Sequence, residues 1–301
     1  MLDLQTIGII AALGSAASWA IGAFLFKKLG ESLSPLAMTL IKGILSLIVL
    51  GAAVACTGVQ SMDASAMGLL ALSGLLGIAL GDTLFFAALR LIQPHTLLVL
   101  GVLGQVLTVA MAVVFLGEFP GWATWLGVAL ILVGVAAVIE SSIASEERAV
   151  RMRGIGWGLL FVVCMSTSTI FAKPALDRLP NDLATLLLAT IVRMGTGTLG
   201  LLAFGLVTRS LGSWIVPFHD RRLFVSFFLA VCVITFGGFW LSLVALKYAD
   251  VIIANALLST EPVMALILGV ICFKERFTWQ AKWGTVATMA GVTSLIVGSA
   301  K

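Results

Sequence analysis

Ten apolar stretches, each about 20 residues long, take up most of this chain. A helix needs roughly 20 residues to cross the hydrocarbon core of a bilayer. The stretches are continuously apolar rather than alternating, which favours helices over strands. We therefore predict an all-α membrane protein. The expected transmembrane helices lie near residues 6–26, 35–57, 65–89, 94–116, 120–140, 154–172, 182–207, 223–246, 251–273 and 279–299.

The composition points the same way. Of the 301 residues, 60% are hydrophobic and only 11% are charged, which is far from the composition of a soluble domain. The net charge of +4 comes from basic residues that sit singly or in small groups at the ends of the stretches, where lipid headgroups would meet them. The expected partners are the lipid bilayer and a small-molecule substrate, and no nucleic acid.

The second half of the chain repeats the first. Five matched pairs of residues lie 157 positions apart: Arg90 and Lys247, Glu118 and Glu275, Trp122 and Trp279, Gly127 and Gly284, and Gly134 and Gly291. Each half holds five of the stretches. Because five is odd, the second copy starts on the opposite side of the membrane, and inverted repeats of this kind are typical of secondary transporters. We assign residues 1–140 to the first five-helix repeat, 141–153 to a polar linker and 154–301 to the second repeat.

Four ionisable residues stand out inside the stretches: Lys42, Asp82, Arg193 and Glu261. A charge at mid-membrane costs at least about 2.5–3.5 kcal/mol, so it usually faces a partner or a watery cavity. One interpretation is a site for a charged or zwitterionic solute, and the other is a structural ion pair. For Lys42 and Arg193 the structural interpretation is favoured, whereas for Asp82 and Glu261 the two are evenly balanced.

The ninth stretch contains Glu261 followed by Pro262. Proline has no backbone N–H and crowds the carbonyl four residues earlier, so the helix should bend there. Asn255, Ser259 and Glu261 cluster near this bend. In the fourth stretch Gln105 stands at the position equivalent to Pro262, so the two halves differ where a solute would bind.

Further candidates come from polar, aromatic and small residues. Ser166-Thr167-Ser168-Thr169 covers every face of the sixth helix, so at least one of these hydroxyls should point into the bundle. We expect Trp19, Phe86 and Trp240 to form apolar walls of the cavity. Gly81 and Gly238 are expected to act as hinges together with Pro262.

We predict no enzyme activity, no catalytic residue, no cofactor and no metal site. The cysteines (Cys56, Cys164, Cys232 and Cys272) lie inside the stretches without metal-ligand spacing. The chain has only two histidines, His95 and His219, and no nucleophile and base stand together. The start, Met1 to Gln5, has no basic region, so the first stretch is expected to be a membrane anchor rather than a cleavable signal.

The order of several motifs resembles the drug/metabolite transporter superfamily, in particular the ten-helix EamA-type carriers. The motifs in the first half are Gly81-Asp82, Ala88-Leu89-Arg90 and Phe115-Leu116-Gly117-Glu118. Those in the second half are Ala245-Leu246-Lys247, Glu261-Pro262 and Phe273-Lys274-Glu275. The resemblance covers nearly the whole chain. Gln105 departs from it, since the family often has a proline there.

This resemblance implies two inverted five-helix repeats around a central cavity. Helices one, three, four, six, eight and nine would line the cavity, with five and ten at the periphery. It also implies export of small metabolites, and amino acid exporters are the closest functional analogy.

The resulting hypothesis is a multi-pass carrier of the cell inner membrane that exports an amino acid by alternating access. Another metabolite or drug (a purine, a sugar-like or a cationic compound) is the alternative substrate, and a non-transporting membrane subunit is the alternative function. Protons are a further candidate partner, through Glu261 or Asp82, and the chain could act as a monomer or a homodimer.

Counting Lys and Arg gives 11 in the loops on one side and four on the other, which would place both termini outside. Organelle relatives keep their termini in the cytosol, so the orientation stays open.

Overall fold

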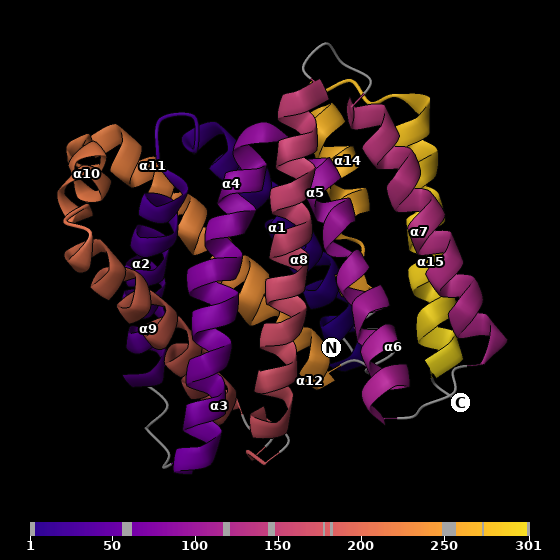
Figure 1. The fold of residues 1–301 in the computed structure, drawn as a ribbon. Coiled ribbons are helices and arrows are strands. Elements are labelled where there is room, and N and C mark those ends of the chain that lie inside the picture. The colour runs from indigo at the N-terminus through magenta and orange to yellow at the C-terminus, as the bar shows by residue number, and fades with distance from the viewer. Residues whose placement is uncertain are drawn as a thin grey trace.

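The computed structural model describes residues 4–55, 62–116, 121–143, 148–176, 178–180, 183–248, 257–272 and 274–299. These residues form helices and no strand, arranged as one bundle of roughly aligned rods (Figure 1). Seven helices are long and apolar enough to cross a membrane, and two shorter apolar helices accompany them within the described residues. Together with α15 (Trp279–Ser299), which is 21 residues long, they make ten segments, and the predicted class, an all-α membrane protein with ten membrane-crossing segments, is confirmed.

The first repeat begins with two long helices and continues with helices that are interrupted. Its elements are α1 (Leu4–Leu29), α2 (Pro35–Ala55), α3 (Ala64–Gly74), η1 (Leu75–Asp82), α4 (Thr83–Leu91), α5 (Pro94–Gly101), α6 (Leu103–Leu116) and α7 (Trp122–Ile143). Here α3, η1 and α4 form one continuous third segment, and α5 with α6 forms a broken fourth one.

The second repeat follows the same plan, with an added pair of short helices. Its elements are α8 (Arg148–Leu176), α9 (Leu183–Val207), α10 (Leu211–Ile215), η2 (Val216–His219), α11 (Arg221–Cys232), η3 (Val233–Trp240), α12 (Leu241–Tyr248), α14 (Glu261–Ile271) and α15 (Trp279–Ser299). Residues 141–143 and 148–153, which the sequence analysis assigned to the linker, are helical.

The repeats match in backbone geometry as well as in sequence. The π-helical segment η1 lies in the third membrane-crossing segment, and η3 lies 158 positions further on in the eighth. A π-helix is rare and frequently marks a functional site. The two segments contain Gly81 and Gly238, the glycines that were predicted to be hinges.

The helices α7 and α15 pack against each other at the edge of the bundle (Figure 1). A Cβ atom at Gly127 would lie 2.7 Å from the carbonyl oxygen of Gly291, and one at Gly291 would lie 2.7 Å from that of Gly127. Gly134 and Gly284 make the same reciprocal contact further along the pair. Small residues allow this close approach in a membrane, and the matched glycines of the two repeats therefore meet each other.

Candidate functional site

The fourth membrane-crossing segment is broken near its middle. Helix α5 ends at Gly101, Val102 forms a turn, and α6 begins at Leu103. The Val102 N–H turns back to the carbonyl oxygen of Val99 at 3.2 Å, in place of the regular helical partner one residue earlier. Glycine loses more backbone entropy in a helix than other residues do, so Gly101 and Gly104 weaken the helix on both sides of the turn. The break therefore forms without the proline that the family often has at this level.

The ninth segment is broken at the equivalent level, as predicted. Ser259 and Thr260 form a turn, and α14 starts at Glu261 with Pro262 in its first turn. The N–H and the hydroxyl of Thr260 both donate to the carbonyl oxygen of Leu257, at 3.1 Å and 2.6 Å. Val102 and Ser259 are 157 positions apart, so the two breaks are related by the repeat.

A cavity of about 320 Å³ lies between the two breaks. Its lining comes from the third, fourth, sixth and ninth segments: Phe85, Leu97, Leu98, Gly101, Val102, Gly104, Gln105, Phe161, Val162, Met165, Ser166, Leu258, Ser259, Glu261 and Pro262. The Gln105 amide nitrogen donates to the Ser259 hydroxyl at 3.0 Å, which joins the two broken segments across the cavity. Pockets for small molecules start at roughly this size.

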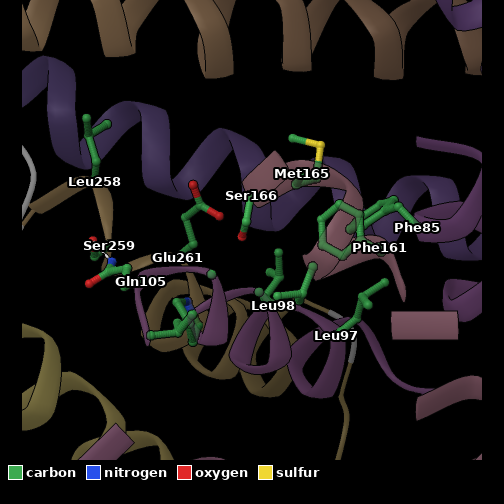
Figure 2. Close-up of a pocket in the computed structure, with 15 residues that line it drawn as sticks. Phe85, Leu97, Leu98, Gln105, Phe161, Met165, Ser166, Leu258, Ser259 and Glu261 are labelled. Carbon is green, nitrogen blue, oxygen red and sulfur yellow. Dashed lines mark hydrogen bonds between the residues drawn. The ribbon is translucent and has the colours of Figure 1, made fainter. Parts of the chain in front are cut away.

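The cavity has a polar end and an apolar end. In Figure 2 the Ser259 and Gln105 side chains lie at one end, and the rings of Phe85 and Phe161 lie at the other, with Glu261 between them. The two phenylalanine rings have centroids 5.3 Å apart in an edge-to-face arrangement. Such a cavity suits an amphipathic molecule, because one end can solvate a polar group while the other holds an apolar body.

The Glu261 carboxylate has no hydrogen bond or ion pair with any residue that the structure describes. Its side chain is partly buried and lines the cavity. Gly101 lies on the cavity wall, and a Cβ atom there would meet no atom within 4 Å. The carboxylate and the open space beside Gly101 therefore belong to the same chamber.

Three of the predicted site residues line this cavity: Ser259, Glu261 and Pro262. Asn255 lies outside the described residues. Asp82 does not line the cavity, since its carboxylate forms an ion pair with Lys42 Nζ at 2.7 Å, and both side chains are largely buried. The structural interpretation therefore fits Lys42 and Asp82 in this structure.

The three predicted aromatic walls lie elsewhere. Phe86 is in the core, only 2% exposed, and its ring packs at 5.2 Å from that of Phe26. Trp19 packs on the backbone of Gly238 and stacks edge-on against Phe239 at 4.8 Å. Trp240 is 41% exposed and is not among the residues that line this cavity. The position of these residues in the sequence did not show which of them face the cavity.

The predicted hinge glycines lie at close helix contacts. A Cβ atom at Gly81 would come within 3.0 Å of Met165 Sδ on α8, and one at Gly238 would touch the Trp19 indole at 3.0 Å. The Gly238 carbonyl oxygen also accepts a 2.7 Å hydrogen bond from the Ser15 hydroxyl. In this structure both glycines permit the π-helical segments to approach a neighbouring helix.

Sequence reasoning missed several lining residues, chiefly Phe85, Gln105, Phe161, Met165 and Ser166. The hydroxyl run on α8 could have identified Ser166. Thr167 and Thr169 bond back to their own helix, at Val163 and Met165, whereas Ser166 and Ser168 are buried. The prediction that at least one hydroxyl of the run points into the bundle is confirmed.

These features define a class of protein. A duplicated bundle of membrane-crossing helices encloses a solute-sized cavity at the level where one helix of each repeat is broken, as in secondary transporters, whose sites are built from discontinuous helices. Within the described residues there is no cluster of three His, Cys, Asp or Glu side chains that could hold a metal ion.

The family can be stated from comparison with known proteins. The model of the EamA-like transporter family matches residues 6–139 and again residues 152–297, so the chain belongs to that family. It is therefore a multi-pass membrane transporter of small molecules. A solved structure, described only as the crystal structure of a protein, superimposes with a TM-score of 0.60 at 17% identity, covering 98% of this chain and 99% of the other, and supports the fold alone. No curated protein sequence gives a significant match.

Proposed function

We propose that this protein is a secondary transporter of the cell inner membrane that exports a small amphipathic metabolite by alternating access, with amino acids as the first substrate class. The observation that carries the proposal is the cavity between two repeat-related helix breaks. Breaks at equivalent levels of inverted repeats allow the two halves to exchange conformations around one site. Gly81, Gly238 and Pro262 are the positions where the backbone would bend.

Glu261, Ser259 and Asn255 would supply the polar contacts to the substrate. Glu261 is also the residue proposed to couple transport to protons, because its carboxylate faces the cavity without a partner among the described residues. A carboxylate in that position can hold either a proton or a cationic group. This feature also favours a second candidate substrate class, cationic amphipathic compounds.

The test is solute flux in vesicles that contain the purified protein. Vesicles that contain the protein and are preloaded with a radiolabelled amino acid should lose it faster than vesicles without protein. An imposed pH gradient should change the rate of this efflux. Glu261→Gln should abolish the response to the gradient, since the amide cannot bind or release a proton. If flux in Glu261→Gln still responds fully to the pH gradient, Glu261 has no coupling role. If no amino acid or amine tested shows flux, the transport proposal is wrong.

A further inference from the structure

The described lining of the cavity carries negative charge and no positive charge. Among the described residues that line it, Glu261 is the only one with an ionisable side chain, and none carries a positive charge. The nearby cations belong to a different group: Lys42 is paired with Asp82, and one Arg193 guanidinium nitrogen donates to Ser168 at 3.3 Å. Neither residue lines the cavity. The chamber therefore presents one negative group to whatever enters it.

The backbone and amide groups at the polar end add hydrogen-bond acceptors. Pro262 cannot donate to the carbonyl oxygen of Leu258, four residues earlier, and both residues line the cavity. Gln105 uses its amide nitrogen on Ser259, which leaves its amide oxygen as an acceptor. A ligand group that donates hydrogen bonds and carries a positive charge fits the Leu258 carbonyl, the Gln105 amide oxygen and the Glu261 carboxylate.

The other end selects an apolar group. Phe85, Phe161 and Met165 face the chamber there, and no charged group accompanies them. Aromatic rings and a thioether hold a flat or branched hydrocarbon well, because rings prefer edge-to-face contacts and methionine adapts its shape.

We infer that the cavity recognises a protonated amine attached to an apolar or aromatic body, with the ammonium group on Glu261 and the body packed against Phe85 and Phe161. The inference rests on the proposed function, since it names the substrate class of the same cavity. An ammonium–carboxylate contact away from bulk water is a strong, charge-assisted hydrogen bond. A carboxylate on the ligand meets no cation on the described lining, and burying it unpaired is costly. An amine should therefore bind better than the corresponding zwitterion, and a carboxylic acid without an amine should not bind.

Three probes with the same phenyl body separate these contributions: phenethylamine, phenylalanine and 3-phenylpropionate. Binding is measured by calorimetry and by the shift in melting temperature of the purified, detergent-solubilised protein. Phenethylamine should bind, phenylalanine should bind about tenfold more weakly, and phenylpropionate should give no signal, because a hydrogen bond to a charged group is worth roughly one decade or more in affinity.

Two variants locate the binding. Glu261→Gln should weaken phenethylamine binding by about tenfold or more. The matched control is Glu140→Gln, which makes the same change on the exposed surface of α7, outside the cavity lining, and should bind as the parent does. Gly101→Leu guards against a folding defect in Glu261→Gln. Its side chain would enter the open space beside Gly101, so it should weaken binding and leave the melting temperature of the ligand-free protein unchanged.

The inference is overturned if phenethylamine does not bind, if phenylpropionate binds as well as phenethylamine, or if Glu261→Gln and Gly101→Leu both bind like the parent. Flux in vesicles is measured separately. The expected binding pattern without flux would remove the transport proposal alone, whereas flux of an amino acid with binding insensitive to Glu261→Gln would remove this inference alone.

Discussion

Among individual residues, the buried pair of Lys42 and Asp82 is the clearest case of charge compensation in the membrane. Lys42 Nζ lies 2.7 Å from the Asp82 carboxylate and over the face of the Phe86 ring, 6.0 Å from its centroid. Asp82 also attracts Arg193 on α9, whose Nε atom is buried without a hydrogen-bond partner in the described residues. The Asp82 carboxylate is thus the ion-pair partner of Lys42 and, among the described residues, the nearest compensating charge for Arg193.

Asp82→Asn should therefore destabilise the folded protein strongly, by about 3–5 kcal/mol, because it leaves a buried cation without its partner. The measurement is the melting temperature in detergent, together with the fraction that remains monodisperse after heating. The double variant Lys42→Met with Asp82→Leu removes both charges and should recover much of the loss. A melting temperature for Asp82→Asn equal to that of the parent would show that the pair contributes nothing to stability.

The sequence could identify which residues were chemically unusual, but not which face each one occupied. Glu261 was found because a carboxylate inside an apolar stretch is rare, and the structure places it on the cavity. Asp82 met the same criterion and lies in an ion pair. Trp19 and Trp240 were assigned to the cavity by residue type alone, and Trp19 lies at a helix contact while Trp240 is absent from the cavity lining. Deciding between such faces needs the rotation of each helix, which a continuously apolar segment does not encode.

At the scale of elements, close contact between α7 and α15 depends on glycines contributed by both repeats. Gly127→Val should force the helices apart, since its Cβ atom would lie 2.7 Å from the Gly291 carbonyl oxygen and from the Leu295 backbone nitrogen. The expected cost is about 1–3 kcal/mol, seen as a lower melting temperature. Gly156→Val on α8 is the matched control, because a Cβ atom there meets no atom within 4 Å. Equal losses in the two variants would show that helix propensity, rather than this contact, sets the stability.

The membrane-crossing segments themselves could be predicted, since each needs only length and apolar composition. Their interruptions were harder. The break in the ninth segment followed from Pro262, whereas the break at Val102 in the fourth segment has no proline to announce it. The π-helical segments η1 and η3 were not predicted, because a shift in hydrogen-bond register leaves no signature in composition. In the sequence they were marked only by the matched pair Gly81 and Gly238, which lie 157 positions apart.

At the scale of the whole molecule, the inverted repeats fix which loops share a side of the membrane. The start of α1 and the end of α15 lie toward the same end of the bundle (Figure 1). The Arg178 guanidinium donates to the Ser65 hydroxyl at 3.0 Å, which ties the loop before α9 to the start of α3 on that side. The segment between α9 and α11 and the segment between α14 and α15 lie at the opposite end (Figure 1).

Single cysteines test this arrangement in a background from which Cys56, Cys164, Cys232 and Cys272 have been removed. In intact cells or sealed vesicles, an impermeant thiol reagent should label cysteines at Asp63 and Arg178 from one side, and cysteines at Ser213 and Arg276 from the other. All four positions are exposed. Labelling of Asp63 and Ser213 from the same side would exclude the inverted arrangement. The same experiment settles which side is the cytosol, where the count of basic residues and the resemblance to organelle relatives disagree.

The glycine-to-glycine contacts between α7 and α15 have one more consequence. Each of these helices is the last of its repeat, so the pair holds the two repeats together at the edge of the bundle. The cavity lies among other segments. Atoms that already touch along two helices have no room to slide past each other without separating. When one half rocks against the other, the α7–α15 pair would then act as the rotation axis. Spin labels placed along this pair would keep a constant separation during transport, whereas the distances between labels on other helices of the two halves would change.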